Sequence, residues 1–149
     1  PDLLNRSSHF LTYPLPGAAG RFAADDVAGL DRIVAKWSPE WAMPAADRAA
    51  AKRAFRHDPE APFGYYRSFV SQITARKAVG AIATPTLLVY GEADGALDPA
   101  DFARSAPYFT GPVTLLGLPH VGHFPQRESP AVFAEAVRAF LGPVPVDAR

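Results

Sequence analysis

The stretch 86-TLLVYGEADG-95 decides the fold of this chain, together with a similar stretch further along, 113-VTLLGLPHVGHF-124. Each begins with a short run of Leu, Val and other apolar residues that ends abruptly at Gly or Pro, a pattern typical of parallel strands buried on both faces. The loop after the first run carries Asp94, and the loop after the second carries His123. Ligands of open α/β sheets bind beyond the carboxyl ends of the strands. We therefore expect Asp94 and His123 to lie within reach of each other there.

The composition is that of an ordinary globular domain. Of the 149 residues, 48% are hydrophobic and 20% are charged, and 15 basic residues balance 15 acidic ones. Nothing in this balance favours a nucleic-acid partner, and no apolar stretch approaches the roughly 20 residues of a membrane span. The absence of cysteine excludes disulfides, thiolate metal sites and a cysteine nucleophile. It also favours a reducing compartment, so we expect a cytoplasmic location.

Helical patterns surround the two strands. Apolar residues at three- and four-residue steps predict one helix over residues 22–37 and others over 44–57 and 63–79. A short helix over 99–106 is expected between the strands, with Asp98 as its N-cap. A closing helix is expected over 131–141, where its apolar face would cover the sheet.

This order of elements predicts two units. Three helices with no strand among them suggest a helical cap over residues 1–80. Strands and helices alternate over residues 81–142, which is typical of an α/β unit. Residues 143–149 are expected to form a frayed tail.

Two segments of the chain resemble the α/β-hydrolases. Residues 85–94 and 121–130 look like the last two strands of that fold, with Asp94 and His123 in the places of the triad acid and histidine. The resemblance implies an α/β fold class: a helical cap followed by the last two parallel strands and the closing helices. In such a triad the histidine takes up the proton of the attacking group. The carboxylate holds the imidazole ring in the tautomer that can do so.

Other residues compete for these two roles. Taken alone, Asp94 is typical of a turn and His123 of a loop, but together, each after a buried strand, they favour a catalytic pair. Asp98 fits the helix N-cap better than the triad. His120 forms a His-x-x-His spacing with His123, but no carboxylate cluster completes a metal site, so we expect no metal. His120 is expected at the rim of the pocket or behind the site.

The nucleophile of the triad is not found in the sequence. The serines lack the flanking glycines of Gly-x-Ser-x-Gly, and no Gly-x-Asp-x follows an apolar strand. The resemblance thus covers about the second half of the fold. We expect a fragment that is inactive alone, with the missing N-terminal half of the same fold as its partner. The isolated chain would expose a strand edge and be marginally stable and prone to associate.

The helical segment resembles the cap of epoxide hydrolases and haloalkane dehalogenases. In 64-GYYR-67, Tyr66 matches the cap tyrosine that donates a hydrogen bond to the epoxide oxygen. The place of the usual second tyrosine falls near His9, and Tyr13 comes too late in the sequence. Trp37 is expected at the substrate site as well, although packing in the core is the simpler role for Trp37 and for two other aromatic residues, Trp41 and Phe63.

These resemblances imply a hydrolase of small apolar molecules that needs no cofactor. Two other functions remain open. One is a serine-type hydrolase of esters or carbon–carbon bonds, since the second tyrosine is absent. The other is a binding module without catalytic activity.

Overall fold

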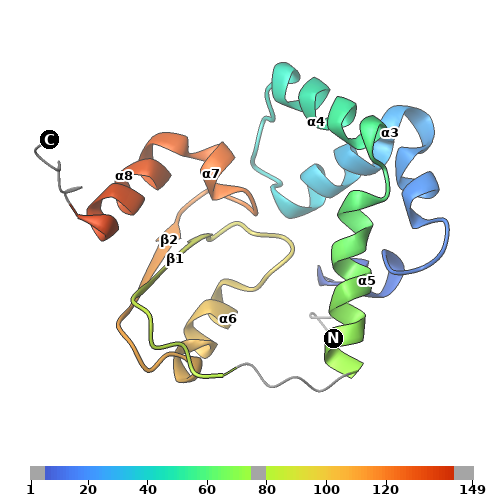
Figure 1. The fold of residues 1–149 in the computed structure, drawn as a ribbon. Helices are drawn as coiled ribbons and strands as arrows, with labels where there is room; N and C mark the ends of the chain where they lie inside the picture. The colour runs from blue at the N-terminus through green and yellow to red at the C-terminus, as the bar shows by residue number, and fades with distance from the viewer. Residues whose placement is uncertain (1–5, 75–79, 143–149) are drawn as a thin grey trace, which may run out of the picture.

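The computed structural model describes residues 6–74 and 80–142. The helical part comprises α2 (His9–Thr12), α3 (Ala18–Trp37), α4 (Ala45–His57) and α5 (Ala61–Thr74). The strand part comprises β1 (Thr86–Gly91), α6 (Pro99–Arg104), the 3-10 turn η1 (Ala106–Tyr108), β2 (Val113–Leu118), α7 (Pro125–Glu128) and α8 (Pro130–Leu141). Figure 1 shows α3, α4 and α5 gathered on one side and the two strands, with α6, α7 and α8, on the other.

The two strands pair in parallel, as predicted. Their register runs from Thr86 opposite Val113 to Gly91 opposite Leu118. Because the two strands are parallel, both end on the same side of the sheet, and the loops that follow β1 and β2 start next to each other. This is the geometric reason why residues 29 positions apart in the sequence can meet.

The expectation that both strands are buried on both faces is wrong. Leu115 on β2 is 38% exposed, and every residue of β1 before Gly91 is only half-buried. Within the described residues the sheet has two strands, and two strands are too few to enclose a core between them. Helix α8 packs on one face, where Phe133 and Val137 share a cleft with Leu87.

Helix α3 begins at Ala18, four residues before the predicted start. Gly17, with a φ of 75°, lets the chain turn into the helix immediately after the Tyr13–Gly17 turn. The helix is also kinked, since residues 24–27 have non-helical backbone angles. The kink buries Val27, which is 1% exposed, and Asp26 forms ion pairs with Lys52 and Arg56 of α4. Tertiary contacts with α4 therefore accompany the break in the regular helix.

The remaining boundaries follow local signals. Helix α4 begins after Pro44 and ends before Asp58, as predicted, and the Asp98 carboxylate accepts the Ala100 N–H at 2.9 Å as the N-cap of α6. Helix α6 is shorter than predicted, because η1 takes over at Ala106. Helix α7, of four residues, was not predicted, since one turn carries no periodicity. The predicted end of the third helix, residues 75–79, and the tail over 143–149 lie outside the described residues.

Aromatic side chains form the core of the helical part. Phe63 of α5 is 1% exposed and packs against Phe55 of α4, with ring centroids 6.0 Å apart. Phe22 of α3 lies 4.8 Å from Phe55 and 5.7 Å from Phe63. These rings hold α3, α4 and α5 together.

We expect Phe63→Ala to lower the free energy of unfolding by about 3–5 kcal/mol, because a large buried ring would be replaced by a cavity. Chemical denaturation followed by circular dichroism measures this loss. Tyr65→Ala on the same helix is the control: Tyr65 is 64% exposed, so its loss should be about 1 kcal/mol or less. Equal losses for the two variants would contradict the burial of Phe63.

Candidate active site

The carboxyl end of α3 joins the two loops that leave the sheet. The last carbonyl groups of a helix have no partner within the helix. The Trp37 carbonyl accepts the Gly95 N–H at 3.0 Å from the loop after β1 and the His123 N–H at 3.2 Å from the loop after β2. One backbone oxygen thus ties both loops to the helical part.

Two glycines allow this close approach. A Cβ on Gly95 would lie 1.9 Å from the Lys36 carbonyl oxygen, and one on Gly122 would lie 2.5 Å from the Ser38 Cα. Neither position can hold a side chain unless the backbone moves. The Gly before the histidine in the sequence is therefore required by the contact with α3.

Asp94 is fixed by its own loop. One carboxylate oxygen, Oδ1, accepts the N–H groups of Ala96 at 2.7 Å and Leu97 at 3.1 Å. The other, Oδ2, lies 2.9 Å from Nδ1 of His123. The residue is 6% exposed. A buried carboxylate with both oxygens engaged can hold the imidazole in a single orientation.

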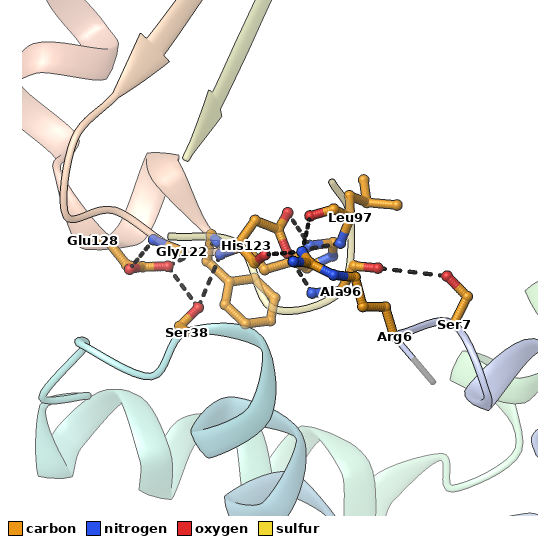
Figure 2. A network of polar contacts seen from close by, with 10 residues as sticks. Arg6, Ser7, Ser38, Ala96, Leu97, Gly122, His123 and Glu128 are labelled. Carbon is orange, nitrogen blue, oxygen red and sulfur yellow. Dashed lines mark hydrogen bonds and ion pairs between the residues drawn. The ribbon is translucent and has the colours of Figure 1, made fainter. Parts of the chain in front are cut away.

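Arg6, in the segment before α2, forms hydrogen bonds to the loop that carries Asp94. Its guanidinium donates to the carbonyl oxygens of Asp94 at 3.1 Å and Leu97 at 3.0 Å. Ser7 adds a longer contact, 3.5 Å, from its hydroxyl to the Ala96 carbonyl (Figure 2). The segment before α2 thereby helps to set the position of the acid.

Ser38 and Glu128 hold the histidine loop. The Glu128 carboxylate accepts the N–H groups of Gly122 at 2.7 Å and Phe124 at 2.9 Å, and the Ser38 hydroxyl at 2.7 Å. The Ser38 hydroxyl oxygen in turn accepts the His123 N–H at 3.0 Å (Figure 2). The backbone on both sides of His123 is therefore anchored.

The three other predicted site residues form a continuous row of rings that ends at His123. The Tyr66 ring lies 5.6 Å from that of His9, which lies 4.8 Å from that of Trp37. The Trp37 ring lies 4.6 Å from the His123 ring. The structure thus brings together the five residues singled out from the sequence: Asp94, His123, Trp37, His9 and Tyr66.

Burial keeps Tyr66 and His9 of this row neutral at pH 7. It raises the pKa of Tyr66 to about 12, with smaller contributions from Tyr13 and Tyr65. It also lowers the pKa of His9, and the positive charges of Lys36 and His123 lower it further, while the Arg6 backbone acts in the opposite sense. At neutral pH both side chains can donate a hydrogen bond without carrying charge.

An aromatic cavity of about 350 Å³ lies beside the row. Tyr66, Trp37, Phe63 and Phe124 are among its lining residues, and the described residues that line it include no Asp, Glu, Lys, Arg or His. A cavity of this size and character suits the apolar part of a small molecule.

His120 lies apart from the pair. Its side chain is 84% exposed, and its Nδ1 lies 2.9 Å from a carboxylate oxygen of Glu40. Across residues 6–74 and 80–142, no group of three or more His, Asp or Glu residues could hold a metal ion. No helix in the same ranges is long and apolar enough to cross a membrane.

Sequence reasoning missed Ser38, Glu128 and Arg6. Ser38 follows α3, and the Pro39 next to it indicates only that a helix ends there. Glu128 comes five residues after His123, a spacing that lets its carboxylate cap the turn at Phe124. For Arg6, which acts on a loop 88 positions away, the sequence contains no signal.

No protein-family model and no curated protein matches this sequence. Solved structures do match. An epoxide hydrolase from Bacillus megaterium in complex with an inhibitor aligns with a TM-score of 0.77 and 17% identity over 94% of this chain. A Klebsiella pneumoniae protein described as an epoxide hydrolase gives 0.70 and 23% over 94% of this chain. Cfl2 from Burkholderia cenocepacia gives 0.69 and 23% over 95%.

These alignments cover 52%, 50% and 50% of the three matched chains, so this chain spans about half their length. The chain has the fold of the C-terminal part of an α/β-hydrolase, which confirms the fold class drawn from the sequence. At such low identity the alignments establish the fold alone.

The lowered pKa of His9 predicts a pH-dependent stability. The unfolded chain takes up a proton near the ordinary value of 6.5, and the folded chain does so only at lower pH. The contribution of neutral, buried His9 to the free energy of unfolding is therefore complete above about pH 6.5. It is lost as the pH falls through the pKa of His9 in the folded chain. We expect the Tm of the wild type to fall more between about pH 7.5 and about pH 5 than that of His9→Phe, which keeps the ring packing.

Thermal melts at the two pH values measure this difference. His120→Gln removes an exposed histidine and serves as the control, whose Tm should follow that of the wild type. If His9→Phe shows the same pH dependence as the wild type, His9 does not lose its proton on folding.

Proposed function

We propose that this chain, with the fold of the C-terminal part of an α/β-hydrolase, supplies the cap and the acid–histidine pair of an enzyme that hydrolyses small apolar molecules, with epoxides as the first candidate. Residues 1–80 would form the cap and residues 81–142 the end of the catalytic core. The observation that carries the proposal is the 2.9 Å contact between the buried Asp94 carboxylate and His123 Nδ1, at the edge of an aromatic cavity.

In this proposal His123 is the general base. Its Nδ1 is engaged by Asp94, which leaves Nε2 to take a proton. A water molecule gives that proton to Nε2, and the hydroxide that forms adds to the carbonyl carbon of a covalent ester intermediate. The tetrahedral intermediate then collapses: the leaving oxygen takes the proton of the added hydroxyl group and departs as the alcohol, which restores the carboxylate nucleophile. The imidazolium of His123 then releases its proton to solvent. Asp94 stabilises the imidazolium during this step.

Tyr66 and His9 are the proposed donors for ring opening. As a carboxylate attacks an epoxide carbon, the carbon–oxygen bond breaks and negative charge develops on the oxygen. The Tyr66 hydroxyl, kept protonated by its pKa of about 12, and the neutral His9 ring can both donate to that oxygen. Two of the matched proteins are described as epoxide hydrolases, which supports this reaction.

The proposed enzyme needs a nucleophile from elsewhere in the fold. The matched structures are about twice as long as this chain, and we propose that the missing N-terminal half supplies the nucleophile and pairs with the edge of β1. An aspartate nucleophile would open epoxides, and a serine nucleophile would cleave esters or carbon–carbon bonds. With an aspartate nucleophile, His123 is needed only to hydrolyse the intermediate. With a serine nucleophile, it is needed to form the intermediate as well.

In the complete enzyme, we expect His123→Gln to reduce turnover by about 10²- to 10⁴-fold, because no other group would activate the water. With an aspartate nucleophile the covalent intermediate should accumulate, and mass spectrometry would detect an increase equal to the mass of the epoxide. With a serine nucleophile no intermediate should accumulate, because the histidine also activates the serine.

The control for that experiment is His120→Gln, which removes a solvent-exposed histidine from the same loop. Its turnover should equal that of the wild type. Unchanged turnover for His123→Gln would reject the proposed role of His123. A complete wild-type protein that binds small apolar molecules but turns none of them over would favour the binding module.

Tyr66→Phe should slow ring opening by about 10²-fold or more, since one donor to the developing oxyanion is lost. Pre-steady-state measurement of intermediate formation with an epoxide would show the loss in the first step. Tyr65→Phe, the neighbouring and exposed tyrosine, should have little effect. An unchanged rate of epoxide opening in Tyr66→Phe would reject Tyr66 as the donor. A wild type that cleaves esters but opens no epoxide would point to the serine-type alternative.

A further inference from the structure

A second cavity, of about 270 Å³, opens beside the aromatic cavity between α2 and α3. Three cationic side chains line it, those of Arg21, Arg32 and Lys36, and the described residues that line it include no carboxylate. Ser8 and Thr12 add two hydroxyl groups. We call this space the basic cavity.

The basic cavity and the aromatic cavity share a wall. Tyr13, Phe22, Ile33 and Trp37 line both. A ligand that lies along this wall would have its apolar part among aromatic rings and its other end among cations. A neutral apolar molecule would use only the first of these two environments.

Arg32 and Tyr13 both line the basic cavity. Burial raises the pKa of Tyr13, and the positive charge of Arg32 opposes that rise. His9, which is 8% exposed, lines the same cavity.

We propose that the two cavities together bind an amphipathic carboxylate, with the carboxylate in the basic cavity and the apolar chain in the aromatic cavity. Taken with the proposed function, on which this step rests, the substrate is an apolar molecule that carries a carboxylate at a distance from the bond to be hydrolysed. The three cations are exposed at the opening of the basic cavity: Arg21, Arg32 and Lys36. Their positive charge attracts the anion from solution and also binds it in the cavity. Arg32 is the first cation to test, since it lines the basic cavity together with the shared residue Tyr13.

The test uses the whole chain and the fluorescence of Trp37. The chain has two tryptophans, and Trp41→Phe leaves Trp37, in the shared wall, as the reporter. Octanoate and its neutral analogue octanamide are titrated against this variant. We expect octanoate to bind about ten-fold more tightly than octanamide, and this preference to shrink as salt is added, because the cations are exposed and screened.

Charge-removing variants identify the site. Arg32→Gln should weaken octanoate binding by about three- to five-fold, and Arg21→Gln combined with it should remove most of the preference over octanamide. Arg53→Gln is the matched control: it removes the same charge from an exposed position on α4 that lines neither cavity, and it should leave binding unchanged. Circular dichroism would verify that each variant keeps the fold.

Three results would overturn the proposal: no binding of octanoate, equal binding of octanoate and octanamide, or an equal loss in Arg53→Gln and Arg32→Gln. The assay measures binding and involves no chemical step, so its outcome does not depend on the role of His123 as a base. Failure of this binding proposal is therefore distinguishable from failure of the proposed hydrolase mechanism.

Discussion

The Trp37 carbonyl oxygen at the end of α3 is the point on which the site depends. A helix end must satisfy its last carbonyl groups, and here the N–H groups of Gly95 and His123 do so. The requirement that stabilises the helix therefore also sets the separation of the loop that carries Asp94 and the loop that carries His123. Gly95 and Gly122 permit this approach because neither has a side chain. Ser38 and Glu128 add hydrogen bonds to the backbone around His123.

The site combines a charged pair with neutral donors. Asp94 is buried and fully hydrogen-bonded, so it can balance a positive charge on His123 without moving. Tyr66 and His9 stay uncharged because burial shifts the pKa of each away from ionisation at neutral pH. The same aromatic packing therefore provides an apolar cavity and keeps the donors protonated.

Much of this fold can be read from local sequence, and the network around the site cannot. The two apolar runs, their order, and the ionisable residue after each were enough to predict a parallel pair of strands and the meeting of Asp94 with His123. Pro44 and Asp98 marked helix starts correctly. The kink in α3 accompanies ion pairs of Asp26 with α4, which lies about 30 positions further along the chain. Arg6 and Ser38 were missed because their partners are about 90 positions away.

The way α3 is bonded to both loops limits how the helical part of this chain can be exchanged. A helical segment outside the sheet is an attractive one to replace. Here α3 ends inside the hydrogen-bond network of the strand loops, so a transplanted helical part would bring the wrong backbone to Gly95 and Gly122. A working chimaera would have to carry over Trp37, Ser38 and Glu128 as one set, with the two glycines that receive them.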